Sequence, residues 1–125
     1  MINAILNDSR YETDVLFANN SMAGVYAYNN SIKEKIVLTD FSGFYGKLRL
    51  LKKLYTKRYI FSIAGFPSHR TSFHILPLIL RIKNRCIHSY NWGNLLRLSF
   101  LSNRKIIANP VLHDVEQNLD LLYFL

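Results

Sequence analysis

The residues best suited to chemistry in this chain are Ser68, His69 and Arg70, which stand side by side after Pro67. They offer a hydroxyl, an imidazole and a guanidinium. The planar fork of arginine matches the oxygens of a phosphate or carboxylate, and the start of a helix favours anions. The segment therefore predicts contact with an anionic ligand. A structural explanation carries equal weight: Ser68 caps the helix that follows, and His69 and Arg70 are solvated.

A second polar pair, His113 and Glu116, stands three residues apart at the start of an expected helix. This offset places both side chains on one helix face. Capping and charge–dipole effects explain the pair better than catalysis does.

Other catalytic patterns are absent from the sequence. It contains no glycine-rich phosphate loop, Walker lysine pattern or nucleophile elbow. Asp14 and Asp40 are explained by a strand edge and a turn. The histidines lack the spacing of metal ligands, and no cysteine accompanies them as a partner; they are His69, His74, His88 and His113. We therefore assign no catalytic, cofactor-binding or metal-binding residue.

The elements that must position the Ser68–Arg70 turn form a strand–helix–strand unit. Residues 59–66 are rich in β-branched and aromatic side chains, residues 71–83 have helical length, and residues 86–90 form a second apolar run. Such a crossover joins parallel strands, and ligands gather at the carboxyl ends of strands in parallel sheets. The turn at residues 67–70 stands at that end of the first strand.

The same alternation recurs along the chain and predicts an α/β fold, a Rossmann-like parallel sheet flanked by helices. We expect strands at 13–18 and 34–39, an extended piece at 105–108, and helices at 3–10, 21–28, 44–57, 95–101 and 113–124. The expected apolar face of helix 44–57 is Phe44, Leu48, Leu51 and Tyr55, with Leu50 and Leu54 beside them. That of helix 113–124 is Val115, Leu119, Leu122 and Tyr123.

Length and composition favour one domain in a reducing compartment. The chain has 125 residues and a single cysteine, Cys86, so it can form no intrachain disulfide. Its amino terminus lacks the pattern of a signal peptide. No window supplies the roughly 20 apolar residues that a membrane-spanning helix needs. We expect a cytoplasmic protein without a transmembrane segment.

Charge is distributed unevenly around a net value of +8. No aspartate or glutamate occurs between Phe41 and His113, and this basic segment favours an anionic partner such as a phosphorylated glycolipid, an anionic membrane surface or nucleic acid. A solvated basic surface is an equally weighted alternative. The cationic residues of the segment are Lys47, Arg49, Lys52, Lys53, Lys57, Arg58, Arg70, Arg81, Lys83, Arg85, Arg97, Arg104 and Lys105.

The order of these segments resembles the amino-terminal domain of glycosyltransferase family nine, the heptosyltransferases of lipopolysaccharide synthesis. The most specific feature is the segment from His113 to Leu122, which is similar to a His-x-x-Glu-x-Asn-Leu-x-Leu-Leu helix near the end of that domain. The other resembling segments are residues 14–18, the strand 36–39 before a Leu/Lys-rich helix, 59–65 leading into 67–72, and 82–85.

The resemblance implies one half of a two-domain GT-B-type enzyme. Its amino-terminal half holds the glycolipid acceptor, and its carboxyl-terminal half binds a nucleotide-diphospho-sugar. An aspartate after the first strand, in a Gly-Asp dipeptide, acts as general base. This sequence has no Gly-Asp dipeptide. We therefore expect residues 1–125 to be a partial acceptor domain that begins inside the first helix, lacks the donor domain and is inactive alone.

These expectations define the partners and leave alternatives open. The expected partner is an anionic glycolipid acceptor or membrane surface, at the inner face of the cytoplasmic membrane, with a nucleotide-sugar only if a donor domain is supplied elsewhere. No nucleic-acid partner is assigned. The alternatives are a small basic nucleic-acid-binding or interaction protein, whose aromatic residues sit mostly at core-facing periods, and a remnant of a truncated or split gene.

Overall fold

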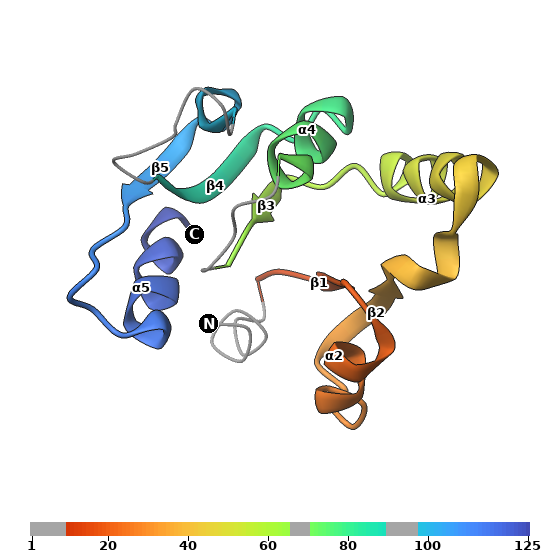
Figure 1. The fold of residues 1–125 in the computed structure, drawn as a ribbon, viewed down its shortest axis with the longest axis horizontal. Coiled ribbons are helices and arrows are strands. Elements are labelled where there is room, and N and C mark those ends of the chain that lie inside the picture. The colour runs from red at the N-terminus through yellow and green to blue at the C-terminus, as the bar shows by residue number, and fades with distance from the viewer. Residues whose placement is uncertain (1–9, 66–70, 90–97) are drawn as a thin grey trace. The chain divides into compact units, whose positions relative to one another are not determined.

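Short strands alternate with helices along the chain, as the sequence pattern predicts (Figure 1). The structure is a computed structural model that describes residues 10–65, 71–89 and 98–125. The strands in these ranges are β1 (Thr13–Phe17), β2 (Ile32–Val37), β3 (Phe61–Ile63), β4 (Asn84–Ser89) and β5 (Arg104–Ile107). The α-helices are α2 (Asn20–Val25), α3 (Gly43–Thr56), α4 (Ser72–Ile79) and α5 (Asp114–Asp120). Three 3₁₀ helices accompany them: η1 (Leu38–Phe41), η2 (Ser99–Leu101) and η3 (Leu121–Phe124).

Every strand pairing in the described ranges is parallel. β1 pairs with β2, and β4 lies between β3 and β5 in a second sheet. The prediction of a mixed α/β fold with parallel sheets flanked by helices is confirmed, and the architecture is compatible with a Rossmann-like fold. The expected helix at 3–10 lies outside the described residues except for Arg10. Residues 95–97 of the expected helix at 95–101 also lie outside them, and residues Ser99–Leu101 form the 3₁₀ helix η2.

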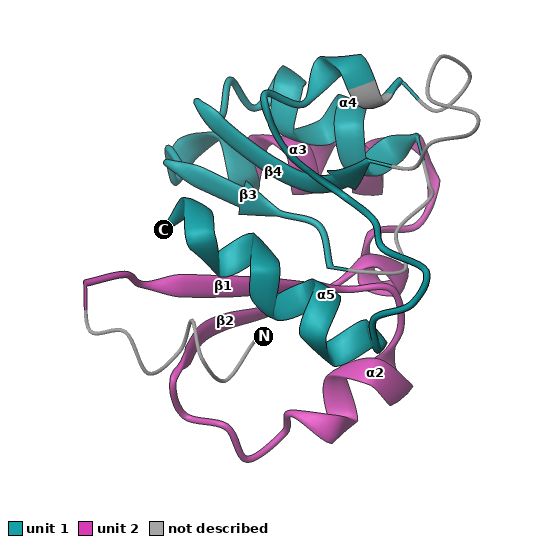
Figure 2. Cartoon of the chain, turned by 90° about the vertical axis from the view of Figure 1, so that its left-hand side faces the viewer, with its two compact units in different colours: residues 1, 54–125 teal, residues 2–53 magenta. Residues whose placement is uncertain are grey.

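The chain divides into two compact units, which Figure 2 colours separately. Unit 2 consists of residues 2–53, and unit 1 consists of residue 1 and residues 54–125. The division falls within α3. Each strand pairing belongs to a single unit.

Unit 2 is built on the β1–α2–β2 crossover. Asn19 caps α2, because its side-chain oxygen accepts a hydrogen bond of 3.0 Å from the Met22 backbone N–H. The rings of Phe17 and Tyr26 lie 5.6 Å apart and join β1 to the end of the helix. Ile32, Ile36 and Val37 of β2 are buried. The short helix α2, which has no buried residue, connects the two parallel strands.

Helix α3 has the predicted length but buries a different face. Leu50 and Leu54, four residues apart, are buried, whereas Phe44, Leu48 and Tyr55 are 71%, 47% and 50% exposed. The prediction that the last three form the core-facing stripe is wrong. Apolar residues occur at several helical offsets in this segment, so the periodicity alone does not select one face.

In unit 1 the central strand β4 is buried on both sides. Cys86, Ile87 and His88 are consecutive and all buried, which requires cover on both faces because successive strand residues point in opposite directions. Figure 2 shows α4 on one side of β3 and β4, and α5 on the other. Helices α4 and η3 both pack on β4. The sheet that contains β4 is therefore the middle layer of three, with helices on both of its faces.

A side-chain clamp fixes the chain between β4 and β5. The Arg85 guanidinium donates to the carbonyl oxygens of Leu101 at 2.8 Å and Ile82 at 2.7 Å. The Asn103 amide accepts from the Arg85 backbone N–H at 2.9 Å and donates to the Lys83 carbonyl at 2.7 Å. Two polar side chains therefore satisfy several backbone groups, and Arg85 has a structural role.

Helix α4 ends at Ile79, four residues before the predicted end at Lys83. The reason is a Schellman motif: the Ile82 N–H donates to the Pro77 carbonyl and the Arg81 N–H to the Leu78 carbonyl, each at 2.9 Å. Arg81 adopts a positive φ of 55° to close this motif. The apolar pattern continues past the cap because Leu80 and Ile82 are also buried.

Helix α5 also buries a face that the periodicity did not indicate. Gln117 and Leu121 are buried, whereas Val115, Leu119 and Tyr123 are 55%, 42% and 88% exposed. The predicted apolar face is therefore wrong. Gln117 and Leu121 lie four residues apart and share a face, and the hydrogen bonds of Gln117 to the loop before the helix favour burial of that face.

The buried Gln117 has hydrogen-bond partners in the preceding loop. Its side-chain oxygen accepts from the Asn109 N–H at 3.1 Å, and its amide nitrogen donates to the Leu112 carbonyl at 3.3 Å. These bonds satisfy a polar side chain in the interior. They also fasten the loop from β5 to α5.

Candidate anion-binding site

The predicted acceptor-binding residues Ser68, His69 and Arg70 lie outside the residues that the structure describes. The described chain resumes at Thr71, which occupies the N-cap position of α4 without a side-chain capping bond. The N-cap position is therefore three residues beyond Ser68. Contact of this turn with an anionic acceptor stays a prediction.

The pair His113 and Glu116 forms a capping box at the start of α5. The Val115 N–H donates to His113 Nδ1 at 3.3 Å, and the His113 N–H donates to Glu116 Oε2 at 3.1 Å. The prediction that these residues fix the helix start is confirmed.

Two further histidines lie in the interior of unit 1. His74 Nδ1 is 3.1 Å from Ser102 Oγ, and both residues are buried. Burial and, to a smaller extent, the Lys105 ammonium lower the pKa of His74. Burial also lowers the pKa of His88 and outweighs the Gln117 backbone and the Asp120 carboxylate, which act in the opposite direction. The His74–Ser102 pair is closed to solvent and has the character of a core contact rather than a nucleophile and its base.

The free energy of unfolding is expected to fall as the pH drops below about 6.5, the ordinary pKa of histidine. Because the pKa values of His74 and His88 are lowered in the folded chain, the unfolded chain binds more protons in acid. Their stabilisation is complete above the ordinary pKa and decreases as the pH falls toward the lowered pKa. Each can add a slope of up to about 1.4 kcal/mol per pH unit. Urea unfolding between pH 7.5 and 5 measures this slope.

His74→Asn and His88→Asn should each flatten that slope, and the double variant should flatten it further. A double variant that keeps the whole wild-type slope would show that other groups titrate on unfolding. The window ends at pH 5 so that most carboxylates remain ionised throughout.

Cys86 is fully buried in β4, and this burial raises the pKa of its thiol to about 11. The thiol is therefore protonated at neutral pH and lacks the exposure of a reactive cysteine. In the described ranges, no three His, Cys, Asp or Glu side chains gather into a group that could hold a metal ion.

A pocket of about 300 Å³ lies at the amino-terminal side of β3 and β4. Two tyrosines, two arginines and a leucine line it: Tyr55, Arg58, Tyr59, Leu80 and Arg81. Arg58 lies in the connection from α3 to β3, and Arg81 in the connection from α4 to β4; both connections can be followed in Figure 1. All five residues belong to unit 1. The pocket combines cationic groups with aromatic and aliphatic surface.

Both arginines of this pocket have a left-handed backbone. The φ angles of Arg58 and Arg81 are 51° and 55°, in a region that residues other than glycine rarely adopt. Within the described part of the chain, neither guanidinium forms an ion pair; the ion pairs shown there are Lys33–Glu12 and Lys53–Glu34. The pocket therefore presents two positive charges without a carboxylate partner.

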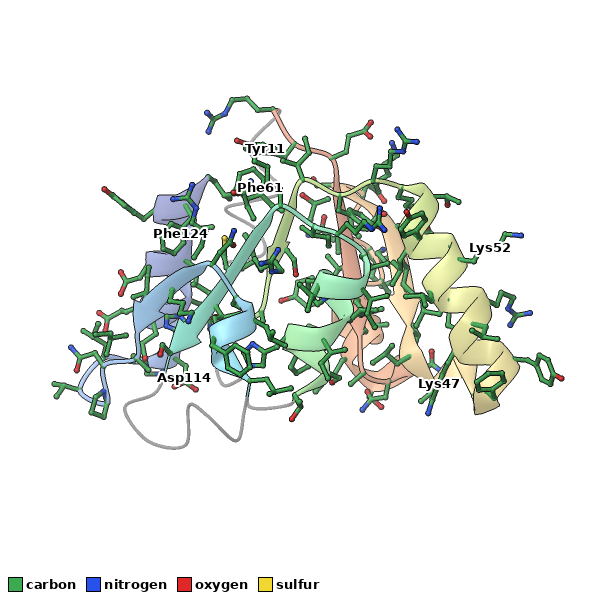
Figure 3. The ribbon with its side chains drawn as sticks, turned by 90° about the horizontal axis from the view of Figure 1, so that it is seen from above. Tyr11, Lys47, Lys52, Phe61, Asp114 and Phe124 are labelled. Atoms are coloured by element: carbon green, nitrogen blue, oxygen red, sulfur yellow. The ribbon has the colours of Figure 1, made fainter. Side chains whose placement is uncertain are left out.

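The residues of the pocket belong to the basic segment from Phe41 to His113, which has no acidic residue. A segment with charges of one sign favours anions. Lys47 and Lys52 of the same segment belong to unit 2, where they project from α3 (Figure 3), and they do not line the pocket.

Sequence reasoning counted Arg58 and Arg81 among the basic residues but did not connect them. A sequence feature that could have indicated the site is the arginine that follows each of the helices α3 and α4. It occupies a position after the helix end where glycine is common. The left-handed backbone and the shared pocket become visible only in the structure.

Comparisons with family models, with curated proteins and with solved structures found no match for this chain. No helix in the described ranges is long and apolar enough to cross a membrane.

Proposed function

We propose that this chain binds an anionic glycolipid of the lipopolysaccharide type, as the acceptor-side part of a heptosyltransferase-like glycosyltransferase. The observation that supports this function best is the order of the parallel strands. In a doubly wound sheet of order 3-2-1-4-5-6, strands 3 and 2 are neighbours, and strands 4, 5 and 6 follow one another. If β1 corresponds to strand 2 of that order, β2 corresponds to strand 3, and β3, β4 and β5 correspond to strands 4, 5 and 6. The pair β2–β1 and the sheet β3–β4–β5 then have the same neighbours as in that order.

The connections between strands support the same assignment. β1 and β2 are joined through α2, and β3 and β4 through α4, as parallel pairing requires. In such sheets the loops after the strands receive the ligand. The turn with Ser68, His69 and Arg70 follows β3 in sequence and is our proposed contact with the acceptor.

The charge pattern supports an acceptor with phosphate groups. The segment from Phe41 to His113 contains only basic charges, and a phosphorylated glycolipid is polyanionic. The proposal also places the protein at an anionic membrane surface when the acceptor is embedded there, because basic segments are attracted to such surfaces.

A binding experiment with a phosphorylated lipopolysaccharide core glycolipid in nanodiscs tests this function. The wild-type chain should bind it at least tenfold more tightly than the enzymatically dephosphorylated glycolipid. Arg70→Gln should weaken binding about tenfold, which corresponds to the loss of one charge-assisted contact. Lys47→Gln, which removes one charge from α3, serves as the control and should change affinity less than twofold.

Equal binding of the phosphorylated and dephosphorylated glycolipids would contradict the proposal. So would equal effects of Arg70→Gln and Lys47→Gln, since these indicate diffuse attraction. Tighter binding of single-stranded DNA, with a steep dependence on salt, would favour the nucleic-acid alternative instead.

A further inference from the structure

We propose that the pocket formed by Tyr55, Arg58, Tyr59, Leu80 and Arg81 binds a phosphate group, which Arg58 and Arg81 hold between them. This anion site is distinct from the turn at Ser68–Arg70. Arg58 precedes β3 in sequence, whereas that turn follows β3. The inference does not rest on the proposed glycosyltransferase function.

The backbone at Arg81 gives the first argument. Arg81 occupies the position after the C-cap Leu80, in the Schellman motif that ends α4. Glycine is the residue that adopts a left-handed backbone there without strain, because it has no Cβ. If only the stability of the turn mattered, glycine would be more favourable than arginine at this position. An arginine at this position therefore carries a cost in stability that glycine would avoid.

Arg58 repeats this arrangement at the end of the preceding helix. α3 ends at Thr56, the Lys57 N–H donates to the Leu54 carbonyl at 3.3 Å, and Arg58 follows with φ of 51°. Two successive helices thus end in a strained arginine, and both arginines line one pocket. Backbone strain gathers at functional sites more than elsewhere. Helix capping alone accounts for the two turns but not for the choice of arginine in both.

The chemistry of the lining gives the second argument and indicates the ligand. Each guanidinium presents a planar set of N–H donors that matches phosphate oxygens, and two of them can neutralise a dianion. The absence of acidic residues from the whole segment 41–113 means that no carboxylate of that segment competes for them. Leu80 and the tyrosine rings add apolar surface beside the charges.

The size of the pocket indicates a phosphate carried on a small organic group. A volume of about 300 Å³ is at the lower end of the range for small-molecule sites and exceeds the needs of a bare phosphate ion. A phosphate monoester of a sugar fits this description, and so does the phosphate headgroup of a lipid. Both sources share the same recognition chemistry, so the experiment has one arm for each.

Glycine variants separate a binding role from a structural role. Arg58→Gly and Arg81→Gly remove the guanidinium and relieve the backbone strain in one step. Titration calorimetry of the wild-type chain with inorganic phosphate should give saturable binding. Each glycine variant should weaken that binding at least tenfold while its thermal midpoint stays equal to that of the wild type or rises. Arg81→Lys keeps the charge and loses the planar fork, so it should also weaken binding. Lys52→Gln, outside the pocket, should change the affinity less than twofold.

Two further arms identify the source of the phosphate. Glucose 6-phosphate represents soluble esters, and vesicles of phosphatidylcholine with phosphatidic acid represent lipid headgroups. Tighter binding of glucose 6-phosphate indicates that the ligand is a soluble ester, and tighter binding of the vesicles indicates a lipid. Either result supports the site when Arg81→Gly abolishes that binding.

The proposal is overturned if inorganic phosphate, glucose 6-phosphate and the vesicles all fail to bind saturably. It is overturned equally if Lys52→Gln weakens binding as much as the arginine variants, because the attraction is then diffuse. A marked drop in the thermal midpoint of both glycine variants would show that the arginines serve the helix ends, and would also overturn it. The glycolipid test relies on Arg70, so the two sites can fail separately.

Discussion

Leu121→Ala is expected to lower the free energy of unfolding by about 3 to 4 kcal/mol, the range typical of a buried leucine whose site cannot collapse. Leu121 is completely buried in η3, and η3 packs on the central strand β4. Truncation would leave a cavity against a strand that is covered on both faces. Denaturation in urea, followed by circular dichroism, measures the loss.

Leu119→Ala is the matched control for this variant. Leu119 is two residues away and 42% exposed. The same truncation should therefore cost less than about 1 kcal/mol, because less apolar surface returns to water and no closed cavity forms. A larger effect at Leu119 than at Leu121 would show that the face predicted from periodicity, with Val115 and Leu119, is the buried one.

Gly46→Ala is expected to destabilise the protein by about 2 kcal/mol, because an added methyl group would be forced against the backbone. A Cβ at this position would lie 2.6 Å from the Phe41 carbonyl carbon and 2.9 Å from its oxygen. These backbone atoms, at the end of η1, cannot rotate away as a flexible side chain can. The clash exceeds the benefit of alanine over glycine inside a helix, which is about 1 kcal/mol.

Gly24→Ala provides the comparison within another helix of the same unit. No atom would lie within 4 Å of a Cβ at Gly24, which belongs to α2. This substitution should stabilise the protein by about 0.5 to 1 kcal/mol. The two variants make the same chemical change with opposite expected signs, and chemical denaturation distinguishes them. Stabilisation by Gly46→Ala would mean that η1 and α3 approach each other less closely than the structure shows.

Local signals in the sequence predicted the elements well. The role of the His113–Glu116 pair could be predicted because capping depends on residues within one helical turn. The alternation of strands and helices followed from composition and spacing. The extended piece at 105–108 proved to be β5, and its pairing with β4 depends on distant residues that no local pattern indicates.

The buried helix faces could not be predicted from the same signals. In α3, apolar residues occupy positions on more than one side, and tertiary contacts select Leu50 and Leu54. In α5, the polar Gln117 is buried because the loop before the helix offers it backbone partners. A hydrophobicity pattern assigns such a glutamine to the surface.

Only part of the candidate site could be predicted from the sequence. Ser68, His69 and Arg70 were predicted from their chemistry and from their place after a strand, and they lie outside the described residues. The pocket at Arg58 and Arg81 depends on a left-handed backbone that the residue type disfavours. Sequence rules place glycine in such turns, so they miss an arginine that occupies the same conformation.

The division into units has a consequence for synthesis on the ribosome. Residues 2–53 form a continuous stretch, and β1 finds its partner β2 within it. The strand pairing of unit 2 can therefore form while the later part of the chain is still being translated. Domains generally fold in this vectorial way, the amino-terminal one first. β1 and β2 would then be paired before Cys86 and the rest of β4 leave the exit tunnel.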